Sequence, residues 1–276
     1  MGKANGQPTL LMISGHPRSG TTLLNRLCNS HPDISMTFEL KVFNNLNMPY
    51  GRHLRRIRHQ WWDQRIVMRG RRRSRRRRKL DSFIFMLKYA FWLRVATHDK
   101  VTIESVRFAL DRAMPHHKYV GDKFPSYNFN LSKHIQHDDM KYLVIYRDCR
   151  RVVKSVFNRD WHGVNLVRFA DARATSQSWV QDIETMERYE DKVHTVRYEA
   201  LLDNPQQVLE ELGEYLDVDP QGFNTKLIKK DKSARNQREL TDEEIEQILE
   251  VPAGTVKSRL HRARNSFAQR IEHFLN

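Results

Sequence analysis

At 276 residues the chain is long enough for one large domain with a buried core, or for one such domain and a small appendage. No apolar run approaches the roughly 20 residues that span a bilayer, and the N-terminal residues lack the pattern of a secretory signal. The two cysteines, Cys28 and Cys149, are too few for a disulfide scaffold and lack the spacing of a zinc site, so we expect free thiols in the reducing cytoplasm. The net charge of +15 comes almost entirely from residues 52–79, which hold 13 arginines and one lysine against one acid, and therefore says little about the fold.

The chain begins with the pattern of a strand, a polar loop and a helix. Residues 9–14 form an apolar run that predicts a short buried strand, and the leucines of residues 21–30 have helical spacing. Further apolar runs, each followed by a helical pattern, predict strands at residues 118–121, 141–146 and 193–198. This alternation favours an α/β fold with a central parallel sheet covered by helices on both faces.

A later helix has clear boundary signals. In DNPQQVLEELGEYLDV, Asn204 can be the N-cap and Pro205 the first helical residue. The apolar residues that follow form one buried stripe, made of Val208, Leu209, Leu212 and Leu216.

The loop between the first strand and helix has the pattern of a phosphate-binding loop. GHPRSGTT, residues 15–22, fits G-x-x-x-x-G, but Thr21 stands where nucleotide-binding loops carry lysine. Backbone N–H groups can still turn inward, and the helix N-terminus adds donors and a positive dipole end. Arg18 offers a planar fork that suits a tetrahedral oxyanion. The pattern indicates an anion-binding loop, with a purely structural glycine turn as the alternative.

Four segments, in order, resemble the sulfotransferase family that uses 3′-phosphoadenosine 5′-phosphosulfate (PAPS). GHPRSGTTLLNRLCNSHPDISMTFE resembles its 5′-phosphosulfate-binding segment and GDKFPSY its lysine–proline segment. YLVIYRDCRRVVKSVFNR is similar to its 3′-phosphate-binding strand and helix, and VRYEALLDNPQQVLEELGEYLDV to its late strand and helix. The likeness covers about residues 8–220 and is strongest to the bacterial and tyrosylprotein-sulfotransferase-like branch. It implies a P-loop-like sulfotransferase fold, PAPS as the sulfuryl donor and no metal, and it explains the missing lysine because PAPS has no γ-phosphate.

The resemblance also implies roles for individual residues. Lys123 matches the lysine that helps to stabilise the leaving group. The 3′-phosphate would be held by Arg147 and Ser155, although Arg147 could instead form a surface salt bridge with Asp148 or another neighbour. Cys149 replaces the proline that is usual in the family, which we interpret as a variation at the start of a helix. The family positions around the phosphosulfate are matched by Arg18, Ser19, Gly20, Thr21 and Thr22.

The acceptor hydroxyl needs a base near the sulfur atom, because it is a poor nucleophile until its proton is taken. Glu39 stands where the tyrosylprotein-type enzymes carry their catalytic glutamate; the alternative is a glutamate that only caps a helix or pairs with Arg18. His31, in a His-Pro pair at the end of a helix, is a rival base that more often has a packing role. Tyr198 is carried over as a contact on the adenine side, with an ordinary core tyrosine as the alternative.

The basic insertion, residues 51–80, falls where the family varies to suit its acceptor. It can be a solvated insertion or a disordered lid. It can also recruit a polyanionic acceptor such as an acidic glycan, a lipid headgroup or an acidic peptide, with Trp61 and Trp62 as stacking platforms. The same charge is compatible with peripheral membrane contact or, electrostatically, with nucleic acid.

The C-terminal tail has a different resemblance. VPAGTVKSRLHRAR, residues 251–264, is similar to the recognition helix-turn-helix of region 4 in extracytoplasmic-function sigma factors, and such a helix would present basic residues to DNA. The alternative is a terminal helix with a basic outer face, packed against the sheet. We therefore expect a sulfotransferase domain over residues 1–235 and a helical tail over 236–276. Late cofactor contacts would fall on Ser233 and Arg235.

These patterns leave three functional hypotheses. The first is a cytoplasmic PAPS-dependent sulfotransferase that acts on a hydroxyl acceptor by in-line displacement, with a carboxylate as general base. The second is a small-molecule kinase that uses the same loop. The third is a nucleic-acid-binding regulator that uses the basic insertion and the tail.

Overall fold

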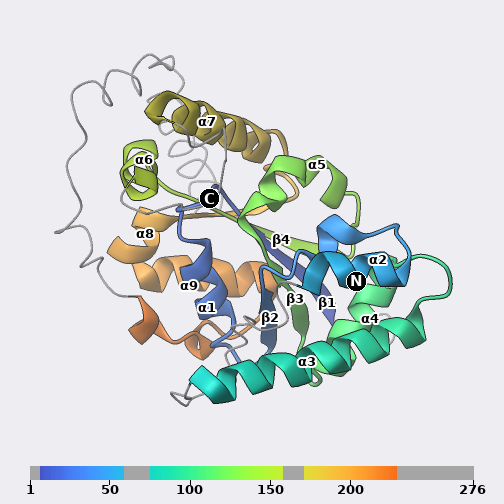
Figure 1. Ribbon diagram of the computed structural model, residues 1–276. Coiled ribbons are helices and arrows are strands. Elements are labelled where there is room, and N and C mark those ends of the chain that lie inside the picture. Colours follow the sequence, from blue (N-terminus) through green and yellow to red (C-terminus); the bar gives the residue numbers. More distant parts are fainter. Residues whose placement is uncertain (1–6, 59–74, 158–170, 229–276) are drawn as a thin grey trace.

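The computed structural model describes residues 7–58, 75–157 and 171–228. These residues build one five-stranded sheet in which every pair of neighbours is parallel, in the order β2-β3-β1-β4-β5. Figure 1 shows this sheet between layers of helices. The strands are β1 (Thr9–Ser14), β2 (Ile34–Phe38), β3 (Tyr119–Lys123), β4 (Met140–Tyr146) and β5 (His194–Arg197).

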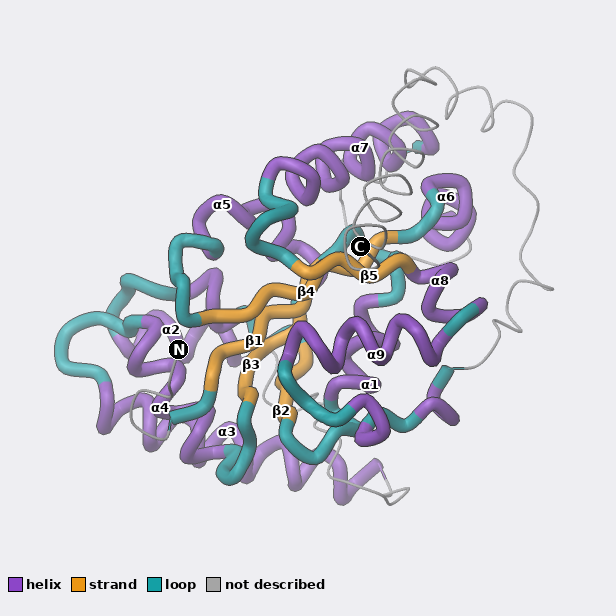
Figure 2. The backbone as a smooth tube through the Cα atoms, turned by 180° about the vertical axis from the view of Figure 1, so that it is seen from behind, coloured by secondary structure: helices purple, strands orange, loops and turns teal. Residues whose placement is uncertain are grey.

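Side-chain alternation along β1 divides the core between the two faces of the sheet. Leu10 and Met12 point into one hydrophobic cluster, and Leu11 and Ile13 point into another. The first cluster is completed by α2 (Tyr50–Ile57), α3 (Arg75–Ala96), α4 (Ile103–Ala113), α5 (Leu131–His134), α6 (Cys149–Phe157) and α7 (Ala172–Arg188). The second is completed by α1 (Thr21–Cys28), α8 (Tyr198–Asp203) and α9 (Pro205–Leu216), of which α1 and α9 lie in front of the sheet in Figure 2.

The sheet confirms the predicted α/β architecture, with helices on both faces of a parallel sheet. The four predicted strands are present within one or two residues of the expected ends, and α9 starts at Pro205 with Asn204 at its N-cap. The Asn204 side chain does not cap the helix; its amide donates to Gln207 Oε1 instead (2.8 Å). Both cysteines are free and buried.

The sequence patterns did not predict β2. Its sequence, ISMTF, alternates polar and apolar residues, yet all five residues are buried because β2 packs against helices while its edge pairs with β3. Tyr198 also differs from the prediction: it starts α8 instead of ending a strand.

Some predicted features lie outside the described residues. These are residues 59–74 of the basic insertion, with Trp61 and Trp62, and the tail from residue 229 onward, with Ser233, Arg235 and the helix-turn-helix-like segment. Among the helices that are described, none has both the length and the apolar character needed to cross a bilayer.

Candidate active site at the carboxyl edge of the sheet

Parallel strands end at the same edge of a sheet, and in open α/β folds that edge carries the ligand site. The loop after β1, the turn after β2, the last residue of β3 and the segments after β4 and β5 all meet there. The backbone joins two of them directly, because Gly15 N–H donates to Pro125 O (3.3 Å) just beyond β3. The residues predicted for the site lie in these five segments, in the first turn of α1 and in the second turn of α6.

The loop after β1 has the close approach that requires glycine at both ends. Gly15 has φ +145°, and a Cβ there would lie 2.1 Å from Ile145 O. Gly20 has φ +100°, and its Cβ would lie 2.4 Å from the ring of Tyr198. Between them Arg18 adopts φ 74°, a left-handed conformation that is uncommon for a residue with a side chain. The loop is thus wedged between β4 and α8, and only glycine fits at these two contacts.

The loop ends at an N-terminus of α1 that is open to an anion. Gly20 provides no capping side chain, and no acidic residue occupies the first helical turn. The first N–H groups of a helix have no intrahelical acceptor, and Thr21 and Thr22 supply two of them. Within the described part of the chain, the buried hydroxyls of Ser14 and Ser19 have no hydrogen-bond partner. Buried hydroxyls are normally paired, so these donors and the helix dipole fit a bound oxyanion.

Glu39 and Lys123 form an ion pair at the ends of two neighbouring strands. Phe38 is paired in register with Lys123, and Glu39 N–H donates to Lys123 O (2.7 Å). The Lys123 ammonium donates to Glu39 Oε1 at 2.7 Å and lies 3.7 Å from the centroid of the Phe38 ring. The Lys123 side chain is fully buried, whereas that of Glu39 is 33% exposed. The pair therefore offers an accessible carboxylate with a buried cation behind it.

The turn that carries Glu39 is held by Asp122, a residue that the sequence analysis did not single out. Asp122 is completely buried and accepts hydrogen bonds from the backbone N–H groups of Leu40 (3.0 Å) and Lys41 (2.7 Å). It also accepts from the hydroxyls of Thr37 (2.5 Å) and Tyr127 (2.6 Å). Burial raises the pKa of Asp122, while the bonds from Thr37 and Tyr127 act in the opposite direction.

The bonds to Asp122 hold the turn after β2 in an unfavourable backbone conformation. Glu39 (φ 55°) and Lys41 (φ 61°) are both left-handed, and the two residues after Glu39 are the ones that Asp122 binds. The segment GDKFPSY contained the signal for this role. Asp122 is a single carboxylate inside a buried strand, and a buried carboxylate requires several hydrogen-bond donors.

The segment after β4 joins the loop on its other side. Arg147 donates to the backbone oxygen of Arg18 (3.4 Å), and Arg18 Nε donates to Ser155 Oγ (3.0 Å), within α6. The Arg147 guanidinium lies over the ring of Tyr198, 4.5 Å from its centroid, and Trp179 Nε1 donates to Arg147 O (2.9 Å). The structure thus brings together Arg18, Arg147, Ser155 and Tyr198, which the sequence separates by up to 180 residues.

Arg147 does not have the surroundings of a surface salt bridge. It is 6% exposed, whereas Arg150 is the residue that pairs with Asp148, at 3.0 Å between Arg150 Nη2 and Asp148 Oδ2. Cys149 is buried at the start of α6.

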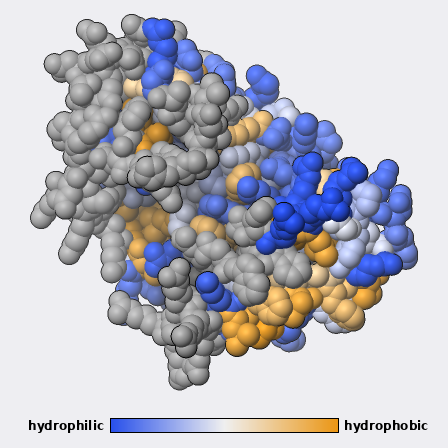
Figure 3. All heavy atoms as spheres, viewed as in Figure 1, coloured by the Kyte–Doolittle hydropathy of each residue, from blue (hydrophilic) through white to orange (hydrophobic). Residues whose placement is uncertain are grey.

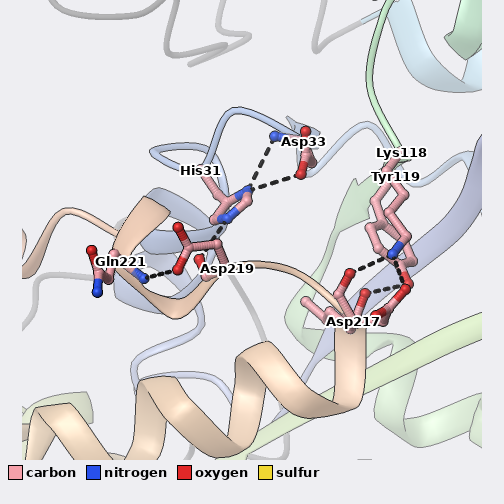
Figure 4. Close-up of polar contacts among 8 residues, drawn as sticks. His31, Asp33, Lys118, Tyr119, Asp217, Asp219 and Gln221 are labelled. Atoms are coloured by element: carbon pink, nitrogen blue, oxygen red, sulfur yellow. Dashed lines mark hydrogen bonds and ion pairs between the residues drawn. The ribbon is translucent and has the colours of Figure 1, made fainter.

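His31 lies away from this group, at the amino edge of the sheet (Figure 4). Both of its ring nitrogens are engaged: Nδ1 accepts from Asp33 N–H (3.1 Å) and Nε2 contacts Asp219 O (2.9 Å). Its ring packs on Phe223, 4.9 Å between centroids, and is 1% exposed. The surroundings of His31 are those of a packing residue, and β2 separates it from Glu39.

The geometry defines a class of protein: an α/β protein with a glycine-bracketed loop before an uncapped helix and a carboxylate–lysine pair at one edge of its sheet. The family model described as Sulfotransferase family matches residues 10–222, and the chain belongs to this family. Among curated proteins there is no match.

Solved sulfotransferases share the fold. The chain is similar to the sulfotransferase domain of the Synechococcus PCC 7002 olefin synthase, with a TM-score of 0.52, 18% identity, and coverage of 95% of this chain and 97% of that domain. It is also similar to a sulfotransferase from Alicyclobacillus acidocaldarius, with a TM-score of 0.52, 16% identity, and coverage of 94% and 96%. The predicted sulfotransferase fold is thereby confirmed.

Proposed function

We propose that this sulfotransferase uses PAPS as its donor and transfers the sulfuryl group to a hydroxyl acceptor, with Glu39 as the general base. The observation that carries the proposal is the Glu39–Lys123 ion pair, which adjoins the oxyanion-binding loop through the Gly15–Pro125 backbone contact. An accessible carboxylate, a buried cation and an anion cradle are the three groups that sulfuryl transfer to a hydroxyl requires.

The features of the loop support a donor with a phosphosulfate end. The unpartnered hydroxyl of Ser19, the uncapped N-terminus of α1 and the fork of Arg18 would hold its oxygens. Arg147 and Ser155, coupled through Arg18, would hold a 3′-phosphate, and Tyr198 would border the adenosine. When bound, PAPS supplies the sulfuryl group and a good leaving group.

The remaining chemistry falls to side chains of this chain. The Glu39 carboxylate, whose side chain is 33% exposed, can take the proton of an acceptor hydroxyl. Lys123 supplies positive charge beside the reacting centre, and Arg18 adds a second cation from the loop. Asp122 acts as a positioning residue, because it holds the left-handed turn that aims the Glu39 carboxylate.

Ligand selectivity tests the donor assignment. Thermal unfolding of the full chain is measured with 3′-phosphoadenosine 5′-phosphate, with adenosine 5′-phosphate, and with ATP plus Mg²⁺. A ligand that binds only the native state raises the melting temperature by mass action. We expect a clear rise with the 3′-phosphorylated nucleotide and little with the other two. An equal rise with ATP plus Mg²⁺ would indicate a kinase instead, and tight duplex DNA binding without any nucleotide response a regulator.

A matched pair of arginine variants sharpens this test. Arg147→Ala removes a charge-assisted contact of about 1.5–3 kcal/mol, so the affinity for 3′-phosphoadenosine 5′-phosphate should fall roughly 10- to 100-fold and the preference for the 3′-phosphate should disappear. Arg150→Ala, three residues away and 72% exposed, should bind both nucleotides as the parent does. An Arg147→Ala protein with unchanged preference would refute the assignment of the 3′-phosphate site.

A further inference from the structure

One helix carries an apolar stripe on its solvent side. The described part of the chain has five exposed large hydrophobic residues, and all of them lie on α3. Their spacing of three and four residues places them on one face of the helix, over about 22 Å of its length. They are Leu80 (55% exposed), Ile84 (43%), Leu87 (48%), Phe91 (60%) and Val95 (54%). In Figure 3 orange spheres gather along the lower border of the molecule, where α3 runs in Figure 1.

The fold does not need this stripe. The opposite face of α3 already packs into the core through Phe85, Met86, Tyr89 and Leu93. An outer face with no packing role would normally be polar, as in other amphipathic surface helices. A contiguous exposed apolar patch on a soluble domain marks a surface that meets a protein or a membrane.

The charges around the stripe indicate which partner it meets. Lys79, Lys88 and Arg94 are exposed on α3, and Asp81 is the only acid of that helix. Helix α2 packs beside α3, through the hydrogen bond from Tyr50 to Ala90 O (3.0 Å) and the contact of His53 with the Tyr89 hydroxyl (3.1 Å). Its exposed side chains add further cations, namely Arg52, Arg55 and Arg56. The exposed charged residues of α2 and α3 that the structure describes are therefore all cationic.

We propose that α3 docks this protein on an anionic lipid surface, with the stripe in the interface and the flanking lysines and arginines at the headgroups. A convex helix with an apolar face and cationic flanks matches a flat, negatively charged interface. A second copy of the chain would bring the same cations against one another, which disfavours self-association through this face. The proposal does not depend on the donor or on the catalytic residues, and it would bring the enzyme to hydroxyl acceptors held in a membrane.

Vesicle co-sedimentation of the full chain tests the proposal. The protein should sediment with vesicles of phosphatidylcholine mixed with phosphatidylglycerol and stay in solution with phosphatidylcholine alone. Leu87→Ser combined with Phe91→Ser should weaken the binding at least tenfold, because it removes the middle of the stripe. Lys88→Glu should weaken it severalfold at low salt and less at high salt, whereas Lys226→Glu, an exposed lysine outside α2 and α3, should behave as the parent does.

Three results would overturn the proposal. The first is the absence of binding to the anionic vesicles. The second is unchanged binding by the Leu87→Ser/Phe91→Ser variant, which would assign the interaction to charge alone. The third is a dimer, seen by sedimentation velocity, that the same variant dissociates, because a second copy would then cover the stripe. The melting temperature without ligand, measured on every variant, verifies folding, and the thermal response to 3′-phosphoadenosine 5′-phosphate, measured separately, tests the proposed activity.

Discussion

Two lysine–carboxylate pairs lie at opposite ends of β3. Lys118, just before the strand, has its Nζ 2.5 Å from Asp217 Oδ2, and the two side chains are 25% and 93% exposed. Lys123, the last residue of the strand, has its Nζ 2.7 Å from Glu39 Oε1, and the two side chains are 0% and 33% exposed. The contacts are alike in chemistry and length, so the difference in burial decides what each pair can do.

The surroundings of the two pairs also differ in how far the neighbouring polar groups are paired. At the amino edge, shown in Figure 4, the polar groups are satisfied locally: Tyr119 donates to Leu216 O (2.7 Å), and Asp219 accepts from Gln221 N–H (3.0 Å). Asp217 is left-handed there (φ 49°), as is common where a helix ends. At the carboxyl edge, left-handed residues, unpartnered hydroxyls and a buried lysine gather in one place. Backbone strain and unpaired buried polar groups in one place are typical of a site that is completed by a ligand.

The largest expected effect is on the carboxylate of the buried pair. If Glu39 takes the proton of the acceptor, Glu39→Gln should lower kcat by about two to four orders of magnitude with little change in donor affinity. Single-turnover kinetics with PAPS measure the chemical step directly. An acceptor of lower pKa, already partly ionised, should restore part of the rate. Parental turnover of Glu39→Gln on an ordinary alcohol would contradict the role of Glu39.

Lys123→Ala tests the cationic partner. We expect kcat to fall about 10²- to 10³-fold, because positive charge beside the departing phosphate is lost, and donor binding to weaken as well. A donor with a better leaving group should rescue this variant and leave Glu39→Gln unaffected. Equal rescue of both variants would mean that the two residues do not act on opposite ends of the transfer.

Asp122→Asn tests how the site is held. An amide cannot accept four hydrogen bonds, so the turn at Leu40 and Lys41 should loosen and kcat should fall about 10- to 100-fold, because small displacements of a catalytic group are costly. The affinity for 3′-phosphoadenosine 5′-phosphate should stay unchanged, and an acceptor of lower pKa should restore part of the rate. A loss of thermal stability with parental kcat would reduce Asp122 to a purely structural residue.

The smallest effect is expected at the other end of β3. Lys118→Ala breaks an ion pair with a largely exposed aspartate, so the free energy of unfolding should change by no more than about 1 kcal/mol. Urea unfolding measures this change, and kcat and KM should equal those of the parent. A drop in kcat for Lys118→Ala comparable to that for Lys123→Ala would remove the contrast between the two edges.

The amino-acid sequence by itself determined the features that depend on nearby residues. The strand, glycine loop and helix at residues 9–28 are predicted, because the spacing of apolar residues and the positions of the glycines are local signals. The start of α9 at Pro205 follows for the same reason. The order of the motifs also identified the sulfotransferase family, and the candidate residues Arg18, Glu39 and Lys123 came with it.

Only the tertiary structure decided which distant residues meet. Glu39 and Lys123 are 84 positions apart and become partners because β2 and β3 pair in parallel with Phe38 opposite Lys123. The role of Asp122 depends on that same register, since its donors come from the turn after β2. The sequence patterns did not predict α3, and packing on one face of this helix decides which of its apolar residues reach solvent. A one-dimensional pattern records spacing along the chain, whereas strand register and helix packing set distances across it.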